Sequence, residues 1–179
     1  MIEVVSGTNR PGANALKIAR QLVAMYEKEG AEVSLFNLQD LPQEIFDPSS
    51  YAKKPDSFAP LQKRILAARG LHIVTPEYNG SLPGVMKYFI DMLKFPESFE
   101  HRCVAFTGEA AGIWGAIRPV EQLQMIFGYR NAYALPERVF IPNVNKVVNE
   151  NGDIVDEVIR GRLEAQVRAF VAFTKRCSN

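Results

Sequence analysis

Hydrophobic and polar positions follow two different periods along the chain, and these periods predict alternating strands and helices. Short apolar runs bounded by Gly, Pro or polar clusters are typical of strands. Five segments fit this description: Ile2–Ser6, Ala31–Leu38, Gly70–Pro76, Arg102–Gly108 and a strand within Tyr133–Ile141. Each run is followed by a turn or loop and then by a segment with a different period.

Apolar residues recur at helical spacing in the segments between these strands. The spacing predicts helices over about residues 14–29, 56–69, a stretch that begins near Pro83, 116–129 and 156–176. Residues 41–60 are rich in Pro, Ser and Asp, which indicates a long loop before the second helix. The polar run at 149–153 predicts a turn in a small hairpin outside the sheet.

Five strands alternating with five helices predict an α/β fold with a five-stranded parallel sheet of order 2-1-3-4-5 and helices on both faces. This arrangement follows because right-handed crossovers return the chain to alternate sides once the winding direction switches. A chain of 179 residues with 47% hydrophobic content suits one domain, residues 1–179, with a full core. In such sheets, ligands bind outside the carboxyl ends of the strands, here between the first and third strands.

Charge and composition favour a small molecule as the ligand. The chain has 21 basic and 20 acidic residues, a formal net charge of +1, so we expect neither nucleic acid nor an anionic membrane as a partner. The first strand pattern begins at Ile2 with no leader before it, and no apolar run reaches a membrane-spanning length, so we expect a cytoplasmic protein. Cys103 and Cys177 lack metal-type spacing, so we expect two reduced thiols and no metal.

The central segment TPEYNGSLPGVMK, from Thr75 to Lys87, is the most informative motif, because it joins a buried strand directly to a helical pattern. Tyr78, Asn79, Gly80 and Ser81 are residue types that tolerate turns and leave backbone groups uncovered. A loop of this kind presents amides and carbonyls to a flat polar ligand. A purely structural turn has the same composition, and this segment alone is consistent with both.

The first loop, GTNRPGAN, combines the Thr8 hydroxyl, the Arg10 guanidinium, a flexible Gly12 and Asn14 at the expected helix start. A helix amino terminus and a bidentate guanidinium together favour an anion such as phosphate. The loop lacks the Lys of a nucleoside triphosphate P-loop and the spaced glycines of dinucleotide-binding folds, so flavin mononucleotide (FMN) fits better. A helix N-cap beside a surface Arg is the structural alternative.

Together, GTNRPGAN and PEYNGSLPGVMK resemble the NADPH-dependent FMN reductase family, a flavodoxin-like group that includes quinone and chromate reductases. The central motif carries the likeness, because its residues stand in the family's order and spacing. The first loop is looser, since Ala13 occupies a place where the family commonly has a second hydroxyl. The resemblance implies a flavodoxin-like three-layer sandwich.

The resemblance also implies the site residues. The FMN phosphate would be held by Thr8, Arg10, Asn14 and the amides of Ala15 and Leu16. The isoalloxazine ring would be lined by Pro76, Glu77, Tyr78, Asn79, Gly80 and Ser81, with Thr107 and Gly108 beside the cofactor from a third loop. No side chain is expected to be catalytic, because the hydride chemistry takes place on FMN while the backbone of residues 79–81 supports the ring.

The implied activity is transfer of electrons from NADPH or NADH through FMN to a quinone, a flavin or a similar small acceptor, in a homodimer or homotetramer. A flavodoxin-like electron carrier and a non-catalytic FMN-binding module are the alternatives. Carrier flavodoxins are strongly acidic, so the net charge of +1 argues against the first. Ala13 is the visible hint of the second.

Several conspicuous residues allow two interpretations each. Glu77 faces either a partner subunit or the amino end of the next helix, and we assign it no proton transfer. Trp114 either covers the flavin or packs in an interface or core. Arg118 meets either a nicotinamide nucleotide phosphate or solvent. The 41–60 loop is either a lid or a surface for a neighbouring subunit, and its aromatic residues are Phe46, Tyr51 and Phe58. His72 and His101 are expected to be structural or exposed.

Overall fold

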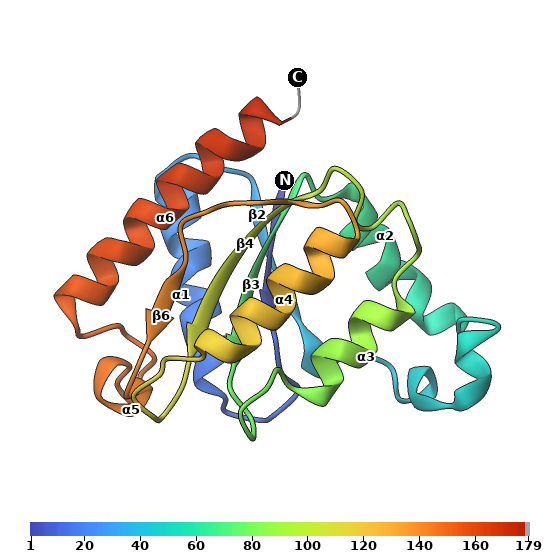
Figure 1. The fold of residues 1–179 in the computed structure, drawn as a ribbon, viewed down its shortest axis with the longest axis horizontal. Helices are drawn as coiled ribbons and strands as arrows, with labels where there is room; N and C mark the ends of the chain where they lie inside the picture. Colours follow the sequence, from blue (N-terminus) through green and yellow to red (C-terminus); the bar gives the residue numbers. More distant parts are fainter. Residues whose placement is uncertain (178–179) are drawn as a thin grey trace.

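A parallel sheet forms the middle layer of the computed structural model, which describes residues 1–177 (Figure 1). Its strands are β1 (Ile2–Ser6), β2 (Val33–Asn37), β3 (Gly70–Pro76), β4 (Cys103–Glu109), β5 (Tyr133–Ala134) and β6 (Val139–Ile141). The order is β2-β1-β3-β4-β5, with β6 also paired to β4. The predicted parallel α/β sheet and its strand order are therefore confirmed. The end of the predicted domain, residues 178–179, lies outside the described residues.

Helices cover both faces of this sheet and complete the three-layer sandwich (Figure 1). On one face, α1 (Asn14–Lys28) and α6 (Glu157–Arg176) enclose a core with a one-turn helix, α5 (Val144–Val147), that the sequence did not predict. On the other face, α2 (Ala59–Ala67), α3 (Gly84–Met92) and α4 (Ile117–Tyr129) enclose a second core. Strands β3 and β4 are buried along their whole length because helices lie on both sides.

The segment predicted to contain the fifth strand forms two short strands. Both β5 and β6 pair with β4, at Cys103–Val104 and at Thr107–Glu109. Pro136, which has no N–H to donate to a ladder, lies in the gap between them. The Gln166 side chain of α6 bridges the gap, donating to the carbonyl oxygens of Phe106 at 2.9 Å and Glu137 at 3.0 Å. The carbonyl groups beside the gap between β5 and β6 are thus hydrogen-bonded by a buried side chain.

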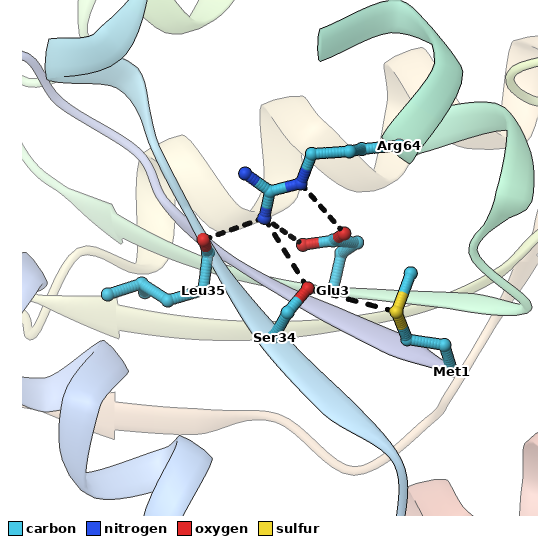
Figure 2. Close-up of polar contacts among 5 residues, drawn as sticks. All are labelled: Met1, Glu3, Ser34, Leu35 and Arg64. Atoms are coloured by element: carbon cyan, nitrogen blue, oxygen red, sulfur yellow. Dashed lines mark hydrogen bonds and ion pairs between the residues drawn. The ribbon is translucent and has the colours of Figure 1, made fainter. Parts of the chain in front are cut away.

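A buried ion pair connects α2 to the first two strands. The Glu3 side chain on β1 is fully buried, and Arg64 of α2 contacts both of its carboxylate oxygens, at 2.9 and 3.3 Å (Figure 2). The same guanidinium donates to the carbonyl of Leu35 on β2 at 2.8 Å. A buried carboxylate requires such a partner, because an unpaired charge in this position would cost several kcal/mol.

The 41–60 loop consists of short 3-10 helices packed on α3 of the same chain. They are η2 (Gln43–Phe46), η3 (Pro48–Tyr51) and η4 (Asp56–Phe58), and η1 (Leu38–Asp40) precedes them. Phe58 is buried, and the rings of Phe46 and Tyr51 lie 5.0 and 5.8 Å from the ring of Tyr88. The Tyr88 hydroxyl donates to the Ile45 carbonyl at 2.6 Å. The helix predicted at 56–69 begins as η4 and continues as α2.

The predicted hairpin at 149–153 is also present. Val148 and Ile154 form an antiparallel bridge, and the Asn149 amide donates to the Asp153 carbonyl at 3.0 Å. The hairpin lies between α5 and α6, outside the parallel sheet.

Candidate active site

The loops that follow β1 and β3 meet at the carboxyl edge of the sheet, as the strand order requires (Figure 1, lower edge of the sheet). The Gly7 amide donates to the Val74 carbonyl at 2.8 Å, and a Cβ on Gly7 would lie only 2.6 Å from that oxygen. Glycine therefore permits this close approach. Beyond it, the Thr8 hydroxyl oxygen lies 3.2 Å from the Tyr78 hydroxyl. The two predicted loops are in direct contact.

A cleft of about 350 Å³ opens between these loops. It is lined by residues 10–14, 76–78, 109–111 and 144–145. Four sequence segments that are far apart in the chain thus converge on one site at the switch point of the sheet. That is the position where open α/β sheets bind their ligands.

The first loop places a hydroxyl and a guanidinium near the amino terminus of α1. The buried Thr8 hydroxyl accepts the Arg10 amide at 3.2 Å, while the Arg10 side chain is exposed. Among the described residues, no side chain forms a capping hydrogen bond with α1, whose N-cap position is Ala13. The capping interpretation of this loop therefore does not hold. The Asn14 side chain donates to Asn145 of α5 at 3.0 Å.

The amides at the start of α1 are partly engaged within the protein. Ala15 is buried, and the Leu16 amide donates to the Ala13 carbonyl at 3.1 Å. The Ala15 amide faces the side chain of Glu109, the last residue of β4, and acts to lower the pKa of its carboxyl group. The carboxyl group of Glu109 thus lies beside an amide that the sequence predicted to hold the phosphate.

Glu109 is nearly buried, with 5% of its surface exposed, and it lines the cleft. Burial raises the pKa of Glu109 to about 7, although the Ala15 amide and the charge of Arg10 act in the opposite direction. Sequence reasoning did not select this residue. An acidic residue at the carboxyl end of an apolar strand was the available signal, since that edge of the sheet carries the site.

The preceding pair in β4, Thr107 and Gly108, packs into the interior. The Thr107 hydroxyl lies 2.9 Å from His72 Nε2 and donates to Gln166 at 2.9 Å. A Cβ on Gly108 would lie 2.8 Å from the Gly115 carbonyl. Both residues face protein rather than the cleft, and Glu109 is the β4 residue that reaches it.

The second loop is a tight turn with two unengaged amides. Tyr78 and Ser81 exchange backbone hydrogen bonds of 3.0 and 3.1 Å. Asn79 and Gly80 between them have positive φ angles of 52° and 75°, a conformation that glycine adopts readily and that asparagine also tolerates. Within residues 1–177, the Asn79 and Gly80 amides donate to no acceptor. These two donors are therefore available to a ligand.

Helix α4 holds the second loop in place. Gln122 accepts the Ser81 hydroxyl at 2.8 Å and the Leu82 amide at 3.1 Å. Arg118, the second residue of α4, forms a 3.0 Å ion pair with Glu77. Nothing in the sequence singled out Gln122, because it is one polar residue among several on a helix.

Glu77 and Trp114 flank the same region. The second carboxylate oxygen of Glu77 is buried without a hydrogen-bond partner among the described residues. The Arg118 guanidinium lies 5.9 Å from the centre of the Trp114 ring, which is 60% exposed. Trp114 is thus a surface residue beside the cleft loops. Arg118 is partly exposed, and it forms an ion pair with Glu77.

The donor set fits FMN at both ends. The Thr8 hydroxyl and the Arg10 guanidinium suit a phosphate, and the amides of Asn79 and Gly80 suit the polar edge of a flat ring. At the ring end of the cleft, one Glu77 oxygen is buried without a hydrogen-bond partner within residues 1–177. A ligand that donates a hydrogen bond to this oxygen would satisfy it. One residue lining the cleft, Glu109, would repel a phosphate when its carboxyl group is ionised.

A flavodoxin-like sheet with a hydroxyl, a guanidinium and a tight turn with free amides at its switch point is typical of flavin-binding oxidoreductases. The family model described as NADPH-dependent FMN reductase matches residues 1–146, and the chain belongs to that family. The predicted recognition, the oxidoreductase activity and the dependence on FMN and a reduced nicotinamide are thereby confirmed over the alternatives of a carrier or a non-catalytic module.

Relatives support this membership over nearly the whole chain. The chain is 29% identical to a quinone reductase of Escherichia coli K12, covering 95% of this chain and 93% of that protein. It is 25% identical to an NAD(P)H-dependent FMN reductase of Pseudomonas aeruginosa, covering 96% and 94%. The solved structure of FerB, a flavoenzyme NAD(P)H:(acceptor) oxidoreductase of Paracoccus denitrificans, matches with a TM-score of 0.79 at 25% identity, covering 98% and 97%.

Proposed function

We propose that the cleft between the first and second loops binds FMN and that the enzyme passes electrons from NADPH or NADH to a quinone, a free flavin or a similar small acceptor. The contact between the Thr8 and Tyr78 hydroxyls carries this proposal. It joins an anion-binding loop and a ring-binding turn into one site. Two relatives are named for different acceptors, a quinone reductase and an NADPH azoreductase, which favours an open site.

At one end of the cleft, Thr8, Arg10 and Asn14 hold the FMN phosphate with the amides of Ala15 and Leu16. The guanidinium supplies a charged bidentate donor, and the α1 macrodipole favours a negative group at this position. The Leu16 amide already donates to Ala13, so we expect the Thr8 hydroxyl and Arg10 to supply most of the affinity at this end.

At the other end, Pro76, Glu77 and Tyr78 line the ring, and the turn of Asn79, Gly80 and Ser81 supports its polar edge. When bound, FMN supplies the redox chemistry, accepting a hydride from the nicotinamide and passing electrons to the acceptor. The free amides of Asn79 and Gly80 stabilise negative charge on the ligand as fixed dipoles. Ser81 acts through position, because its hydroxyl and amide are bound to Gln122 and Tyr78.

We further propose that residues 1–179 form one domain that pairs with a second copy through α3 and α4. Large apolar side chains on this side are exposed: Phe95 by 58%, Met125 by 69% and Tyr129 by 80%. They line a groove of about 400 Å³, together with other apolar side chains and the charged residues Lys87, Asp91 and Arg130. Exposed apolar surface of this kind is typical of a protein interface. We propose a homodimer, or a homotetramer built from two such pairs.

We also propose a cytoplasmic location. No helix within residues 1–177 combines the length and apolar character that crossing a bilayer requires. NADPH and NADH, the proposed electron donors, are present in the cytoplasm, which agrees with this location.

Purification with FMN, followed by anaerobic addition of NADPH, tests the function. We expect a yellow protein whose flavin absorbance bleaches on NADPH addition and recovers when a soluble quinone is added. A yellow protein that NADPH does not bleach would indicate an electron carrier. A colourless protein that does not bind FMN would overturn the proposal.

A further inference from the structure

The carboxyl group of Glu109 lies in the cleft beside the groups that we propose to bind the phosphate. It faces the Ala15 amide at the amino end of α1, and the positive charge of Arg10 is near enough to act on its pKa. It is almost entirely buried, and it lines the same cleft as Arg10 and Asn14. These are the groups that a flavin phosphate would use.

We propose that Glu109 is a specificity-determining residue of the cofactor cleft: a flavin phosphate enters this position only when the Glu109 carboxyl takes up a proton from solvent. This inference rests on the proposed binding of FMN in the cleft. It concerns the charge state in which the site accepts that ligand, not whether flavin chemistry occurs there.

Electrostatics supplies the reason. A phosphate monoester carries about −1.5 to −2 charges at neutral pH, so an ionised carboxylate at the same amides would repel it strongly in a desolvated site. A protonated carboxyl has an O–H that donates to a phosphate oxygen and thus turns repulsion into a hydrogen bond. The proton taken from solvent remains on Glu109 in the complex.

The neighbouring charges make Glu109 the group that takes up the proton. Within the described residues, the charged or titratable groups lining the cleft beside it are Arg10, Glu77 and Tyr78. Glu77 is paired with Arg118 and Tyr78 is hydrogen-bonded to Thr8. Burial raises the pKa of Glu109 to about 7, so a proton is available to it near neutral pH.

FMN and riboflavin titrations of the whole protein between about pH 6.5 and pH 9 test the proposal, because riboflavin lacks the phosphate. Above pH 7.5 the phosphate itself no longer titrates, since its second pKa is about 6. We expect the Kd for FMN to rise about tenfold per pH unit in the alkaline range, with riboflavin affinity unchanged. Calorimetry in two buffers of different ionisation enthalpy should show uptake of about one proton per FMN at pH 8.

The variant Glu109→Gln keeps the shape of the side chain and removes its charge. In it we expect FMN affinity independent of pH and at least about tenfold tighter than wild type at pH 9. Glu121→Gln, on the exposed face of α4, is the matched control and should behave as wild type. Riboflavin binding by each variant shows that the cleft is folded, and the wild-type calorimetry needs no variant at all.

The outcomes of these titrations distinguish the role of Glu109 from the proposed binding of FMN. FMN binding that is independent of pH and takes up no proton, or a pH dependence that persists in Glu109→Gln, would overturn the role of Glu109 and leave the proposed function standing. A protein that binds neither flavin at any pH would overturn both. Proton-linked FMN binding that disappears in Glu109→Gln supports the role of Glu109.

Discussion

The hydroxyl oxygens of Thr8 and Tyr78 lie 3.2 Å apart, although 70 residues separate them in sequence. Thr8 follows β1 and Tyr78 follows β3, which are neighbouring parallel strands. This hydrogen bond links the phosphate end of the proposed cofactor site to its ring end. It is therefore a local measure of how well the two loops are assembled.

A double-mutant cycle on this pair should detect the coupling. Thr8→Val and Tyr78→Phe each remove one hydroxyl with little change of shape. We expect a coupling of about 0.5–1.5 kcal/mol in the free energy of unfolding, as for a partly buried hydrogen bond. Denaturant unfolding measures it. The matched control pairs Thr8→Val with Tyr129→Phe on exposed Tyr129, where no coupling is expected. Zero coupling for Thr8 with Tyr78 would show that the contact does not form in solution.

The turn at Gly80 should tolerate no side chain. Gly80 has a φ of 75°, where a Cβ costs about 1–2 kcal/mol in an L-residue. Gly80→Ala should lower FMN affinity and the free energy of unfolding, and Gly80→Val should do so more severely. Gly84, four residues later at the start of α3, has open space around its Cα and a negative φ. Gly84→Ala should therefore be neutral or stabilising. Equal flavin affinity in both variants would count against the role of the turn.

The strand order and the meeting of the Thr8 and Tyr78 loops at one edge of the sheet were predictable, because they follow from the periodicity of the chain and the handedness of the crossovers. Periodicity defines the strands, and the strand order then places the Thr8 and Tyr78 loops at one edge. The groups that complete the site come from elsewhere: Gln122 and Arg118 from α4 hold the second loop. Their roles depend on tertiary contacts that no short motif encodes. The break between β5 and β6 was likewise missed, although Pro136 in that segment marked it.

His72 should make stability depend on pH. Its Nδ1 lies 2.7 Å from the Tyr26 hydroxyl, and burial lowers the pKa of His72 to about 3, below the unfolded value of 6.5. Between these values the unfolded chain binds a proton that the folded protein does not. The contribution of neutral His72 to the free energy of unfolding is therefore complete above pH 6.5. It is lost by about 1.4 kcal/mol per pH unit as the pH falls toward 3.

Comparison with His72→Gln isolates this effect from other titrating groups. Glu109 acts in the opposite direction, because its raised pKa makes stability decrease with pH from about 4.5 to about 7. The wild-type curve thus mixes the two, whereas the difference in unfolding free energy between wild type and His72→Gln reports His72. That difference should decrease steadily as the pH falls below 6.5. A difference that is constant with pH would contradict a neutral buried His72.

Removal of Arg64 should leave the buried Glu3 carboxylate unpaired. We expect Arg64→Met to cost about 3 kcal/mol of unfolding free energy, the lower end for a buried pair because Arg64 is 37% exposed. Glu3→Leu combined with Arg64→Met should recover much of this loss, since no charge is then buried. Lys87→Met, which breaks a surface pair with Asp91, serves as the control and should cost less than about 0.5 kcal/mol. If Arg64→Met matched that control, the buried pair would be energetically unimportant.

The exposed apolar side of α3 and α4 should control assembly. Met125→Lys and Tyr129→Lys, alone and together, place charges in the proposed interface without touching the flavin cleft. Analytical ultracentrifugation should show an oligomer for the wild type and a monomer for the double variant. A monomeric wild type, or an oligomer unaffected by both charges, would place the interface elsewhere or exclude it.

A crystal structure of the protein with FMN tests the central claim most directly. We predict phosphate oxygens within hydrogen-bond distance, about 2.7–3.2 Å, of the Thr8 hydroxyl and the Arg10 guanidinium. The ring should lie against Tyr78, with its polar edge at the amides of Asn79 and Gly80. FMN bound away from these loops, for example in the groove beside α3 and α4, would contradict it.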